Sequence, residues 1–440
     1  MHPALLPQDI DPTPAELIAA RPQLSMHAMD GLMLEGVPLN AIADALGTPT
    51  WVTSAGTFRD RLTQLQSAFQ DLPLSIHYAV KANDHLALLR IVQRAGAGAD
   101  VVSGGEILRA VTAGIDPAQI VFAGVGKAEW ELRLALEHGV GQFNVESAEE
   151  LAMLSANAHG MGRTAKVALR INPDVDAGTH PKITTGLADN KFGIAYTDVA
   201  ALYAHAATLP GLQPVGISLH IGSQILALAP FRAAYTRAAE LVRTLRAMGQ
   251  TVTMVDCGGG LGIAYRDELV PLASALAAVI RQTLGGLDVR LAIEPGRWLA
   301  GPSGLLLTSV VLIKHAARRF VVLDAAMNDL IRPAMYESWH GIVPVGAADA
   351  VAAPIPADIV GPVCESGDIF ARGRALPPLR PGARLAILDT GAYGSVMSST
   401  YNARPLAAQA VVDGDRWAMT RARQPLTALW DGEIVPDWLV

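Results

Sequence analysis

The sequence predicts an α/β protein with a (β/α)8 TIM-type barrel and a second, mostly antiparallel β domain. Two observations predict the barrel: short apolar runs recur eight times between residues 75 and 297, and helical patterns fill most of the intervals. A third predicts the second domain, because from about residue 304 the chain becomes a succession of strand-like runs. We expect residues 45–300 to form the barrel, residues 301–440 the β domain, and residues 1–44 an N-terminal segment that joins the β domain.

The barrel strands are expected where the eight apolar runs begin, at residues 75, 98, 120, 142, 166, 214, 252 and 290. Parallel strands that are buried on both faces are almost continuously apolar, as these runs are. Amphipathic patterns with a glycine near the end lie between them, for example at residues 85–96, 149–160 and 231–249. A doubly wound open sheet would give the same alternation and is the main alternative.

Each apolar run ends in a polar or glycine-rich signature, and this favours the barrel. In a closed barrel the carboxyl ends of all strands lie on one rim, where barrel enzymes carry their chemistry. The signatures are Lys81, Ser103 to Gly105, Gly124, Glu146 and Ser147, Asn172, His220 to Gln224, Gly258 to Gly260, and Glu294 to Arg297.

The β domain is expected from the runs at residues 304–314, 318–327, 357–364 and 383–391, and from a hairpin signal at Asp413-Gly414 within 409–421. The N-terminal run "DGLMLEGVPL" resembles these strands more than the barrel runs. We therefore expect it to join the β domain.

Composition narrows the class of protein. The chain has 51% hydrophobic and 17% charged residues, so it can bury a sizeable core. Its net charge is −7 and it has no basic run, and both features argue against a nucleic-acid partner. Two cysteines are too few for a disulfide framework and fit a reducing compartment. The first residues, "MHPALLPQDIDPTPAEL", do not read as a signal peptide, and no apolar run reads as a membrane span. We expect a cytoplasmic protein with a small-molecule substrate and no membrane partner.

Lys81 and His220 are candidate catalytic residues on the predicted rim. A buried lysine without a partner loses its proton readily, as an amine nucleophile toward a carbonyl must. Taken alone, however, Lys81 reads as a strand-end lysine that reaches solvent. His220 could serve as a base, a ligand or a flat stacking surface, or be a structural histidine.

Two motifs after the seventh and eighth strands suggest an anion site. The N–H groups of Gly258, Gly259 and Gly260 can surround an anion, although a plain tight turn has the same sequence. "EPGR", Glu294 to Arg297, offers opposite charges to one ligand, or forms a surface ion pair. Barrels commonly bind phosphate at these two loops. The dinucleotide spacing G-x-G-x-x-G is absent from the triplet.

The β domain contributes two further motifs, "CESGD" from Cys364 and "DTGAYGSVM" from Asp389. The Cys364 thiol stands in a polar loop, where it could donate a proton. No closely spaced pair of zinc ligands is present, so no metal is expected, and no G-x-S-x-G elbow supports a serine hydrolase.

The ordered set of motifs resembles the fold type III pyridoxal-phosphate-dependent decarboxylases, whose architecture is that of alanine racemase, and within them the diaminopimelate decarboxylases. The resemblance extends over nearly the whole chain from about residue 45. The motifs are "YAVKAN", "DVVSGGEI", "NVESAEEL", "RINPDVDAGTHPKITTGLADNKFGI", "HIGSQI", "CGGGLGI", "EPGR", "DLIRPAMY", "CESGD", "GAYG" and "YNARP".

The resemblance implies pyridoxal 5'-phosphate as the cofactor. Lys81 would form the internal Schiff base, His220 would stack on the ring, and Glu294 would face the pyridine nitrogen and keep it protonated. The residues implied for the phosphate are Ser223, Gly258, Gly259, Gly260, the "EPGR" residues Gly296 and Arg297, and Tyr393.

The resemblance also implies the substrate, meso-2,6-diaminopimelate, which is converted to L-lysine and carbon dioxide in lysine biosynthesis. Arg297, Arg332 and Tyr336, with Tyr393 beside them, would bind the distal carboxylate. Glu365 would meet the substrate's ammonium group and Cys364 would donate a proton. In the family, Cys364 and Glu365 come from the neighbouring subunit, so the resemblance implies a homodimer with shared sites.

Two other readings remain. Related decarboxylases act on ornithine, arginine or carboxynorspermidine. Ornithine and arginine lack a distal carboxylate, so these substrates would leave Arg332 and Tyr336 unexplained. Carboxynorspermidine is harder to exclude. A non-catalytic pyridoxal-phosphate carrier shares the barrel but lacks a β domain. Two departures from the family pattern, Trp298 after "EPGR" and the loosely matching C-terminal residues 423–440, touch none of these roles.

Overall fold

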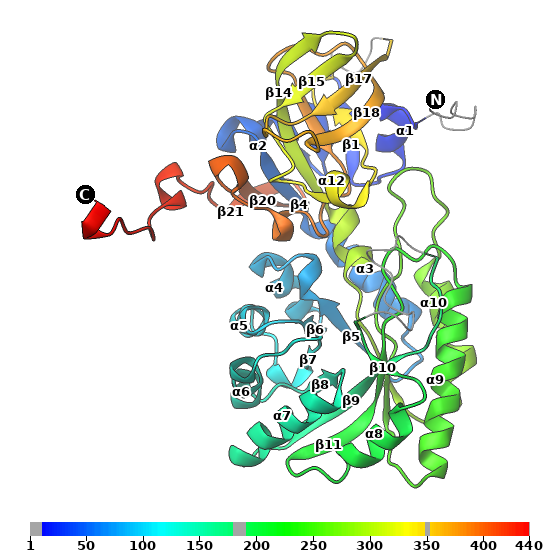
Figure 1. The fold of residues 1–440 in the computed structure, drawn as a ribbon. Helices are drawn as coiled ribbons and strands as arrows, with labels where there is room; N and C mark the ends of the chain where they lie inside the picture. Colours follow the sequence, from blue (N-terminus) through cyan, green and yellow to red (C-terminus); the bar gives the residue numbers. More distant parts are fainter. Residues whose placement is uncertain (1–10, 179–190, 348–352, 440) are drawn as a thin grey trace. The chain divides into compact units, whose positions relative to one another are not determined.

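The computed structural model describes residues 11–178, 191–347 and 353–439. It divides into two compact units, which we call the barrel unit and the β unit (Figure 1). The barrel unit comprises residues 58–264 and 268–300. The β unit comprises the residues up to 57, the short segment 265–267, and the chain from residue 301 onward.

The barrel unit contains eight parallel strands that pair in a closed ring. Neighbours along the chain pair in turn, β13 pairs with β5, and β8 pairs with β9, so every strand of the ring has two partners. This confirms the predicted barrel and rules out the open sheet. The strands are β5 (Leu74–Ala79), β6 (Gly98–Val101), β7 (Ile120–Phe122), β8 (Gln142–Val145), β9 (Ala165–Asn172), β11 (Leu212–Leu219), β12 (Met254–Asp256) and β13 (Arg290–Ile293), and the two-residue β10 (Ile194–Ala195) pairs with the end of β9.

Helices connect the strands and begin at residues that cap them. Ser103 and Ser147 each stand one residue before a helix and accept a hydrogen bond from a backbone N–H of its first turn, at 3.2 Å. Gly139 ends another helix in the left-handed conformation that glycine adopts easily. The helices are α3 (Ala55–Ala68), α4 (Leu86–Arg94), α5 (Gly104–Thr112), α6 (Glu129–His138), α7 (Ala148–Gly160), α8 (Val199–Ala206), α9 (Ala229–Ala247), α10 (Ala273–Leu284) and α11 (Arg297–Ala300).

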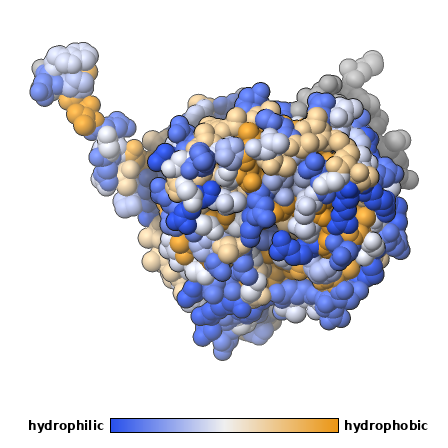
Figure 2. Space-filling view, turned by 90° about the horizontal axis from the view of Figure 1, so that it is seen from below, coloured by the Kyte–Doolittle hydropathy of each residue, from blue (hydrophilic) through white to orange (hydrophobic). Residues whose placement is uncertain are grey.

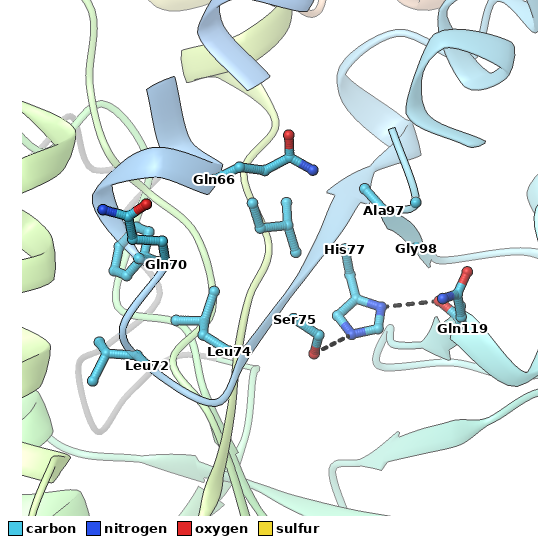
Figure 3. Close-up of a pocket in the computed structure, with 12 residues that line it drawn as sticks. Gln66, Gln70, Leu72, Leu74, Ser75, His77, Ala97, Gly98 and Gln119 are labelled. Carbon is cyan, nitrogen blue, oxygen red and sulfur yellow. Dashed lines mark hydrogen bonds between the residues drawn. The ribbon is translucent and has the colours of Figure 1, made fainter. Parts of the chain in front are cut away.

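At the amino end of the barrel strands, His77 on β5 is buried and hydrogen-bonded on both ring nitrogens (Figure 3). Nδ1 lies 3.0 Å from the Gln119 carbonyl oxygen and Nε2 lies 3.0 Å from Ser75 Oγ. A Cβ at Gly98 would lie 2.1 Å from that carbonyl oxygen and 2.6 Å from Nδ1, so only glycine leaves room for the ring. Burial lowers the pKa of His77, and the ring is neutral.

The β unit is built on a mostly antiparallel sheet in the order β18-β17-β15-β14-β4-β20-β21, with β16 and β19 attached through β14. Two pairs, β15 with β17 and β4 with β20, are parallel. The strands are β4 (Thr50–Ser54), β14 (Gly304–His315), β15 (Arg319–Leu323), β16 (Ile342–Pro344), β17 (Ile355–Val360), β18 (Ile369–Leu376), β19 (Arg384–Ile387), β20 (Ala408–Asp413) and β21 (Arg416–Arg421). The predicted hairpin joins β20 to β21.

The N-terminal residues of the chain belong to the β unit. Leu32, Leu34 and Val37 are buried in one core with Leu307 of β14 and Val343 of β16. The elements here are α1 (Pro14–Ala19), a three-stranded sheet of β1 (Leu24–His27), β2 (Gly31–Leu34) and β3 (Val37–Pro38), and α2 (Leu39–Leu46). Residues 45–57, which the sequence analysis assigned to the barrel, lie in the β unit because β4 pairs with β14 and β20.

The last residues of the β unit form an arm beyond β21, visible as the extension at the upper left of Figure 2. Its root is fixed, since the Gln424 N–H donates to the Leu406 carbonyl at 3.0 Å. Beyond it, Trp430, Ile434 and Trp438 are exposed by 54%, 89% and 80%. No helix among the described residues combines the length and apolar character needed to cross a membrane.

Candidate active site

The rim of the barrel unit holds a cavity of about 520 Å³. Side chains from several strand ends line it, as the recurring polar signatures predicted. The lining residues include Lys81, Val102, Gly124, Asn144, Arg170, Phe192, Ser218, His220 and Glu294.

Lys81 is the second residue after β5, in the middle of a single 3₁₀ turn. Its Nζ donates to Asp100 Oδ2 at 2.8 Å, and the lysine side chain is 35% exposed whereas that of Asp100 is fully buried. Neither simple reading of the sequence describes this lysine, since it is neither dry and unpartnered nor directed to bulk solvent. It is an amine held at the cavity by a buried carboxylate.

His220 lies directly after β11 and presents a neutral ring to the cavity. Its Nδ1 accepts a hydrogen bond from the Gly259 N–H at 3.2 Å. Burial, with Arg170 and Lys81 nearby, holds the pKa of His220 well below its usual value. The ring is therefore an uncharged flat surface whose orientation is set by the glycine loop.

The three glycines after β12 are required by their surroundings. A Cβ at Gly258, Gly259 or Gly260 would lie 2.0, 2.2 or 2.4 Å from a backbone carbonyl oxygen, closer than any side chain can approach. Gly258 and Gly260 also have positive φ angles, +67° and +106°. The loop is thus a tight turn in which Gly258 is buried and Gly259 and Gly260 are partly exposed, and the Gly258 N–H donates to Asp256 Oδ1 at 3.0 Å.

Ser223 and Arg297 lie next to each other beside this loop. Arg297 Nη2 donates to Ser223 Oγ at 3.2 Å, and the Ile225 N–H donates to the Gly260 carbonyl at 2.9 Å. Arg297 is buried, so it is not half of a surface ion pair. Gly296 precedes it, and its carbonyl accepts from the Ala300 N–H at 3.0 Å to start α11. A serine hydroxyl, a guanidinium and a glycine loop are groups that hold a phosphate.

Glu294 directly follows β13 and is buried. Its Oε1 accepts from Asn144 Nδ2 at 3.1 Å. Burial raises the pKa of Glu294 well above its usual value, and the neighbouring Asp100 and Asp256 raise it further, against the opposing charge of Lys81. The carboxyl therefore keeps its proton in a pH range where an exposed glutamate is ionised.

Sequence reasoning gave no role to Asn144 and Arg170 of the cavity wall, or to Asp100, which accepts from Lys81. Arg170 on β9 donates to Glu146 Oε1 at 2.7 Å and lies 4.9 Å from the Phe192 ring centroid. The available signal was a polar residue within an apolar run, in "GADVVS", "QFNVES" and "KVALRIN". Part of the motif at residues 170–194 lies outside the described residues.

The β unit carries the remaining candidates. Arg332 begins α12 (Arg332–Tyr336) and is buried, with Nη2 donating to Ser338 Oγ at 3.2 Å. Tyr336 ends the same helix and is partly buried, as is Tyr393, which has a positive φ of 55°. Arg332 and Tyr336 are thereby placed one helical turn apart.

Cys364 and Glu365 are exposed on a loop whose backbone is fixed by neighbouring side chains. The Cys364 N–H donates to Asn402 Oδ1 at 2.9 Å, and Tyr401 Oη donates to Glu365 Oε2 at 3.2 Å. Asp368 accepts from the Val363 and Met327 N–H groups, each at 2.7 Å. The thiol is accessible while its backbone is held.

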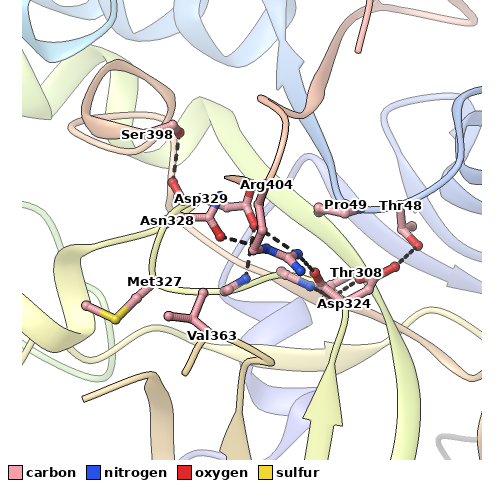
Figure 4. A network of polar contacts seen from close by, with 12 residues as sticks. Thr48, Pro49, Thr308, Asp324, Met327, Asn328, Asp329, Val363, Ser398 and Arg404 are labelled. Atoms are coloured by element: carbon pink, nitrogen blue, oxygen red, sulfur yellow. Dashed lines mark hydrogen bonds and ion pairs between the residues drawn. The ribbon is translucent and has the colours of Figure 1, made fainter. Parts of the chain in front are cut away.

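Arg404 lies at the centre of a polar network behind this loop (Figure 4). It donates to Asn328 Oδ1 at 2.9 Å and to the Asp324 carbonyl, and its Nη2 lies 4.0 Å from Asp329 Oδ2. Burial raises the pKa of Asp329 to about 6. The network joins the segments around residues 324–329 and 398–404, and the "YNARP" motif thereby gains a structural role.

Comparisons with known proteins agree with this arrangement. Residues 55–301 match the family described as the pyridoxal-binding domain of pyridoxal-dependent decarboxylases. A diaminopimelate decarboxylase from Pseudomonas aeruginosa is 47% identical over 403 residues, 91% of this chain and 96% of the relative.

Solved structures give the same result. Diaminopimelate decarboxylase from Helicobacter pylori, complexed with L-lysine, is similar with a TM-score of 0.86 and 38% identity, covering 89% of this chain and 98% of that one. The diaminopimelate decarboxylase from M. jannaschii in co-complex with L-lysine is similar with a TM-score of 0.90 and 34% identity. The match covers 96% of this chain and 99% of that one.

Proposed function

This chain belongs to the pyridoxal-dependent decarboxylases, among the diaminopimelate decarboxylases, and we propose that its barrel cavity converts meso-2,6-diaminopimelate to L-lysine and carbon dioxide. It is a carboxy-lyase that uses pyridoxal 5'-phosphate. The observation that carries the proposal is the combination at one cavity of an amine, a neutral imidazole and a buried protonated carboxyl, beside a tight glycine loop.

The residues present fit pyridoxal phosphate. The glycine triplet, Ser223 and the Gly296–Arg297 segment would hold its phosphate, His220 would stack on its ring, and Glu294 would face its ring nitrogen. When bound, the cofactor supplies a conjugated ring that accepts the electron pair left as carbon dioxide departs.

Lys81 would hold the cofactor covalently through its amine. An ammonium must lose a proton before it can attack a carbonyl, and Asp100 Oδ2, 2.8 Å from Nζ, is positioned to take that proton. Asp100 is fully buried and the Lys81 side chain is 35% exposed, so solvent reaches this contact only from the lysine.

Residues of the β unit would recognise the rest of the substrate. Arg332 and Tyr336, with Arg297 and Tyr393, would bind the distal carboxylate, and the planar guanidinium suits a carboxylate. Glu365 would bind the ammonium group, and Cys364 would donate a proton to the carbon that has lost its carboxylate.

We further propose a cytoplasmic homodimer in which Cys364 and Glu365 serve the neighbouring subunit's site. The exposure of both residues in the single chain supports this arrangement. Sedimentation equilibrium of the holoenzyme tests it; a monomer with full specific activity would contradict it.

A carbon dioxide release assay tests the substrate. We expect activity on meso-diaminopimelate and none on D- or L-lysine, L-ornithine or L-arginine, because these lack the distal carboxylate that Arg332 would bind. Carboxynorspermidine is the closest competitor, and activity on it alone would overturn the assignment. A non-catalytic carrier would bind the cofactor and release no carbon dioxide from any of them.

A further inference from the structure

A second buried side chain of the β unit, His340, holds the guanidinium of Arg332. Arg332 is 3% exposed and His340 is 1% exposed. The chain turns between them at Glu337, which follows α12 with a positive φ of 53°. This turn brings the imidazole to the edge of the guanidinium, where Arg332 Nε donates to His340 Nε2 at 3.3 Å.

This contact fixes the tautomer of His340. A guanidinium Nε carries its hydrogen at every pH at which proteins fold, so His340 Nε2 accepts and carries no hydrogen. The ring hydrogen is then on Nδ1, which donates to the Leu388 carbonyl at 2.9 Å. A doubly protonated ring would turn an N–H group toward the Nε–H of a cation. The imidazole is therefore neutral while the contact with Arg332 holds.

The backbone around His340 is anchored independently of Arg332. Arg374 Nη1 donates to the His340 carbonyl at 2.8 Å, and the Leu388 N–H donates to the Gly341 carbonyl at 2.8 Å. The next residue, Ile342, begins β16, which pairs with β19. His340 is thus a fixed acceptor, and the longer arginine side chain is the partner that it orients.

Two further contacts bear on the plane of the guanidinium. Arg332 Nη2 donates to Ser338 Oγ at 3.2 Å, and Arg332 Cζ lies 5.0 Å from the centroid of the Tyr265 ring. The Tyr265 and His340 rings meet edge to face, with their centroids 5.1 Å apart. A guanidinium binds a carboxylate best through two parallel N–H groups, so the direction of its plane affects its affinity.

We propose that His340 is a positioning residue for substrate recognition, because its neutral imidazole orients Arg332 toward the distal carboxylate of the substrate. In this role His340 acts only through the guanidinium. The inference rests on the proposed function, in which Arg332 binds that carboxylate. Since the distal carboxylate takes no part in the loss of carbon dioxide, removing His340 should raise KM and leave kcat unchanged.

Two variants separate the two ring nitrogens of His340. In His340→Gln the amide oxygen can replace Nε2 and accept from Arg332. In His340→Asn the shorter amide can replace only Nδ1 and its donation to the Leu388 carbonyl. We expect His340→Asn to raise the KM for meso-diaminopimelate about tenfold, the effect of losing one hydrogen bond from a charged group. His340→Gln should restore most of the loss.

Inhibition of the holoenzyme by two amines gives a readout that a merely structural role would not produce. L-lysine carries the carboxylate that Arg332 would bind, and cadaverine is the same diamine chain without it. In His340→Asn the inhibition constant of L-lysine should rise about tenfold, and that of cadaverine should stay as in wild type. Equal weakening of both amines, or an unchanged KM, would overturn the inference.

His340→Phe covers the case in which the smaller asparagine unfolds the chain. It keeps a ring of similar size beside Tyr265 but has no acceptor for Arg332, so it should show the same difference between L-lysine and cadaverine. Loss of the folded holoenzyme in both variants would indicate a structural role and count against the proposal.

A double variant shows whether His340 acts through Arg332. In an Arg332→Gln background, adding His340→Asn should weaken L-lysine no further, because no guanidinium is left to orient. A further loss in the double variant would refute the positioning role. Absence of carbon dioxide release from meso-diaminopimelate by the wild-type holoenzyme would instead contradict the proposed function.

Discussion

The barrel unit and the β unit hold the side chains that we propose to be functional by different means. In the barrel, Lys81, His220 and Glu294 stand at the ends of different strands, and the closed hydrogen-bonded ring places them together. In the β unit, Cys364 and Glu365 stand on an exposed loop that depends on side chains such as Asn402 and Asp368.

Because of this difference, we expect the effects of some substitutions to stay at the substituted residue and those of others to reach neighbouring residues. A barrel rim residue can be replaced without moving its strand, because backbone pairing fixes the strand. A loop held by side-chain hydrogen bonds loses its geometry when one donor or acceptor is removed. Substitutions in the barrel should therefore remove chemistry, and those in the β unit should also disturb position.

The largest effect should come from Lys81→Ala. Without the amine the cofactor is not held covalently, and turnover should fall at least about 10⁴-fold, a small part of the 10⁶–10¹⁷-fold acceleration that enzymes reach. The purified wild-type protein should be yellow, and borohydride should fix cofactor to a peptide containing Lys81, read by mass spectrometry. The exposed barrel residue Lys166 supplies the control, since Lys166→Ala should behave as wild type. Label on any other lysine would contradict the assignment.

The next effect should come from Cys364→Ala. Removing a proton donor should lower kcat about 10²-fold, at the lower end of general acid catalysis, with product released slowly. The cofactor spectrum and affinity should be unchanged, because the thiol belongs to the exposed loop and not to the barrel cavity. Cys257→Ala is the matched control. Unchanged turnover of Cys364→Ala would remove this thiol from the mechanism.

Arg404→Ala should have a smaller effect that tests the bracing of the loop. It removes a charged donor to Asn328 and to the Asp324 carbonyl. We expect the free energy of unfolding of the β unit to fall by about 2 kcal/mol. We expect kcat/KM to fall about tenfold with cofactor affinity unchanged, and Arg404→Lys to restore part of it. Arg318→Ala removes a side chain that is 65% exposed from its ion pair with the buried Asp358, and should cost less than about 1 kcal/mol. Equal effects of the two alanine variants would refute the bracing role.

The smallest effect should be a pH dependence of stability from Asp329. Its pKa is raised from 3.8 to about 6, so the folded state holds this proton more tightly than the unfolded state does. Stability contributed by the protonated carboxyl is therefore lost as pH rises through this window. The melting temperature of Asp329→Asn minus that of wild type should therefore increase as pH rises from 4 to 7. A constant difference across that range would show that Asp329 does not titrate there.

Much of the barrel could be predicted from sequence because its signals are local. The β12 run begins two residues later than expected, at Met254, and the β6, β7, β8 and β13 runs begin where expected. The polar strand ends predicted the cavity, since parallel strands bring equivalent ends together. Asp100 and Asn144 were missed because a single polar residue inside an apolar run gives no sign of which way it points.

The β unit was less predictable because its decisive contacts join distant residues. β4 precedes the barrel in the chain, and its pairing with β14 and β20 has no local signature. Likewise Arg404 and Asn328 lie 76 residues apart, so the "YNARP" motif could be recognised without its partners. The three-residue β16 and the eight-residue β18 were not predicted at all.

The closure of the barrel between β8 and β9 bears on the tendency of the protein to aggregate. An unpaired strand edge invites other chains to add to it, and a closed ring of strands presents none. Two copies of this chain therefore cannot join by extending the ring of the barrel, and self-association through strand pairing would have to use another sheet of the molecule.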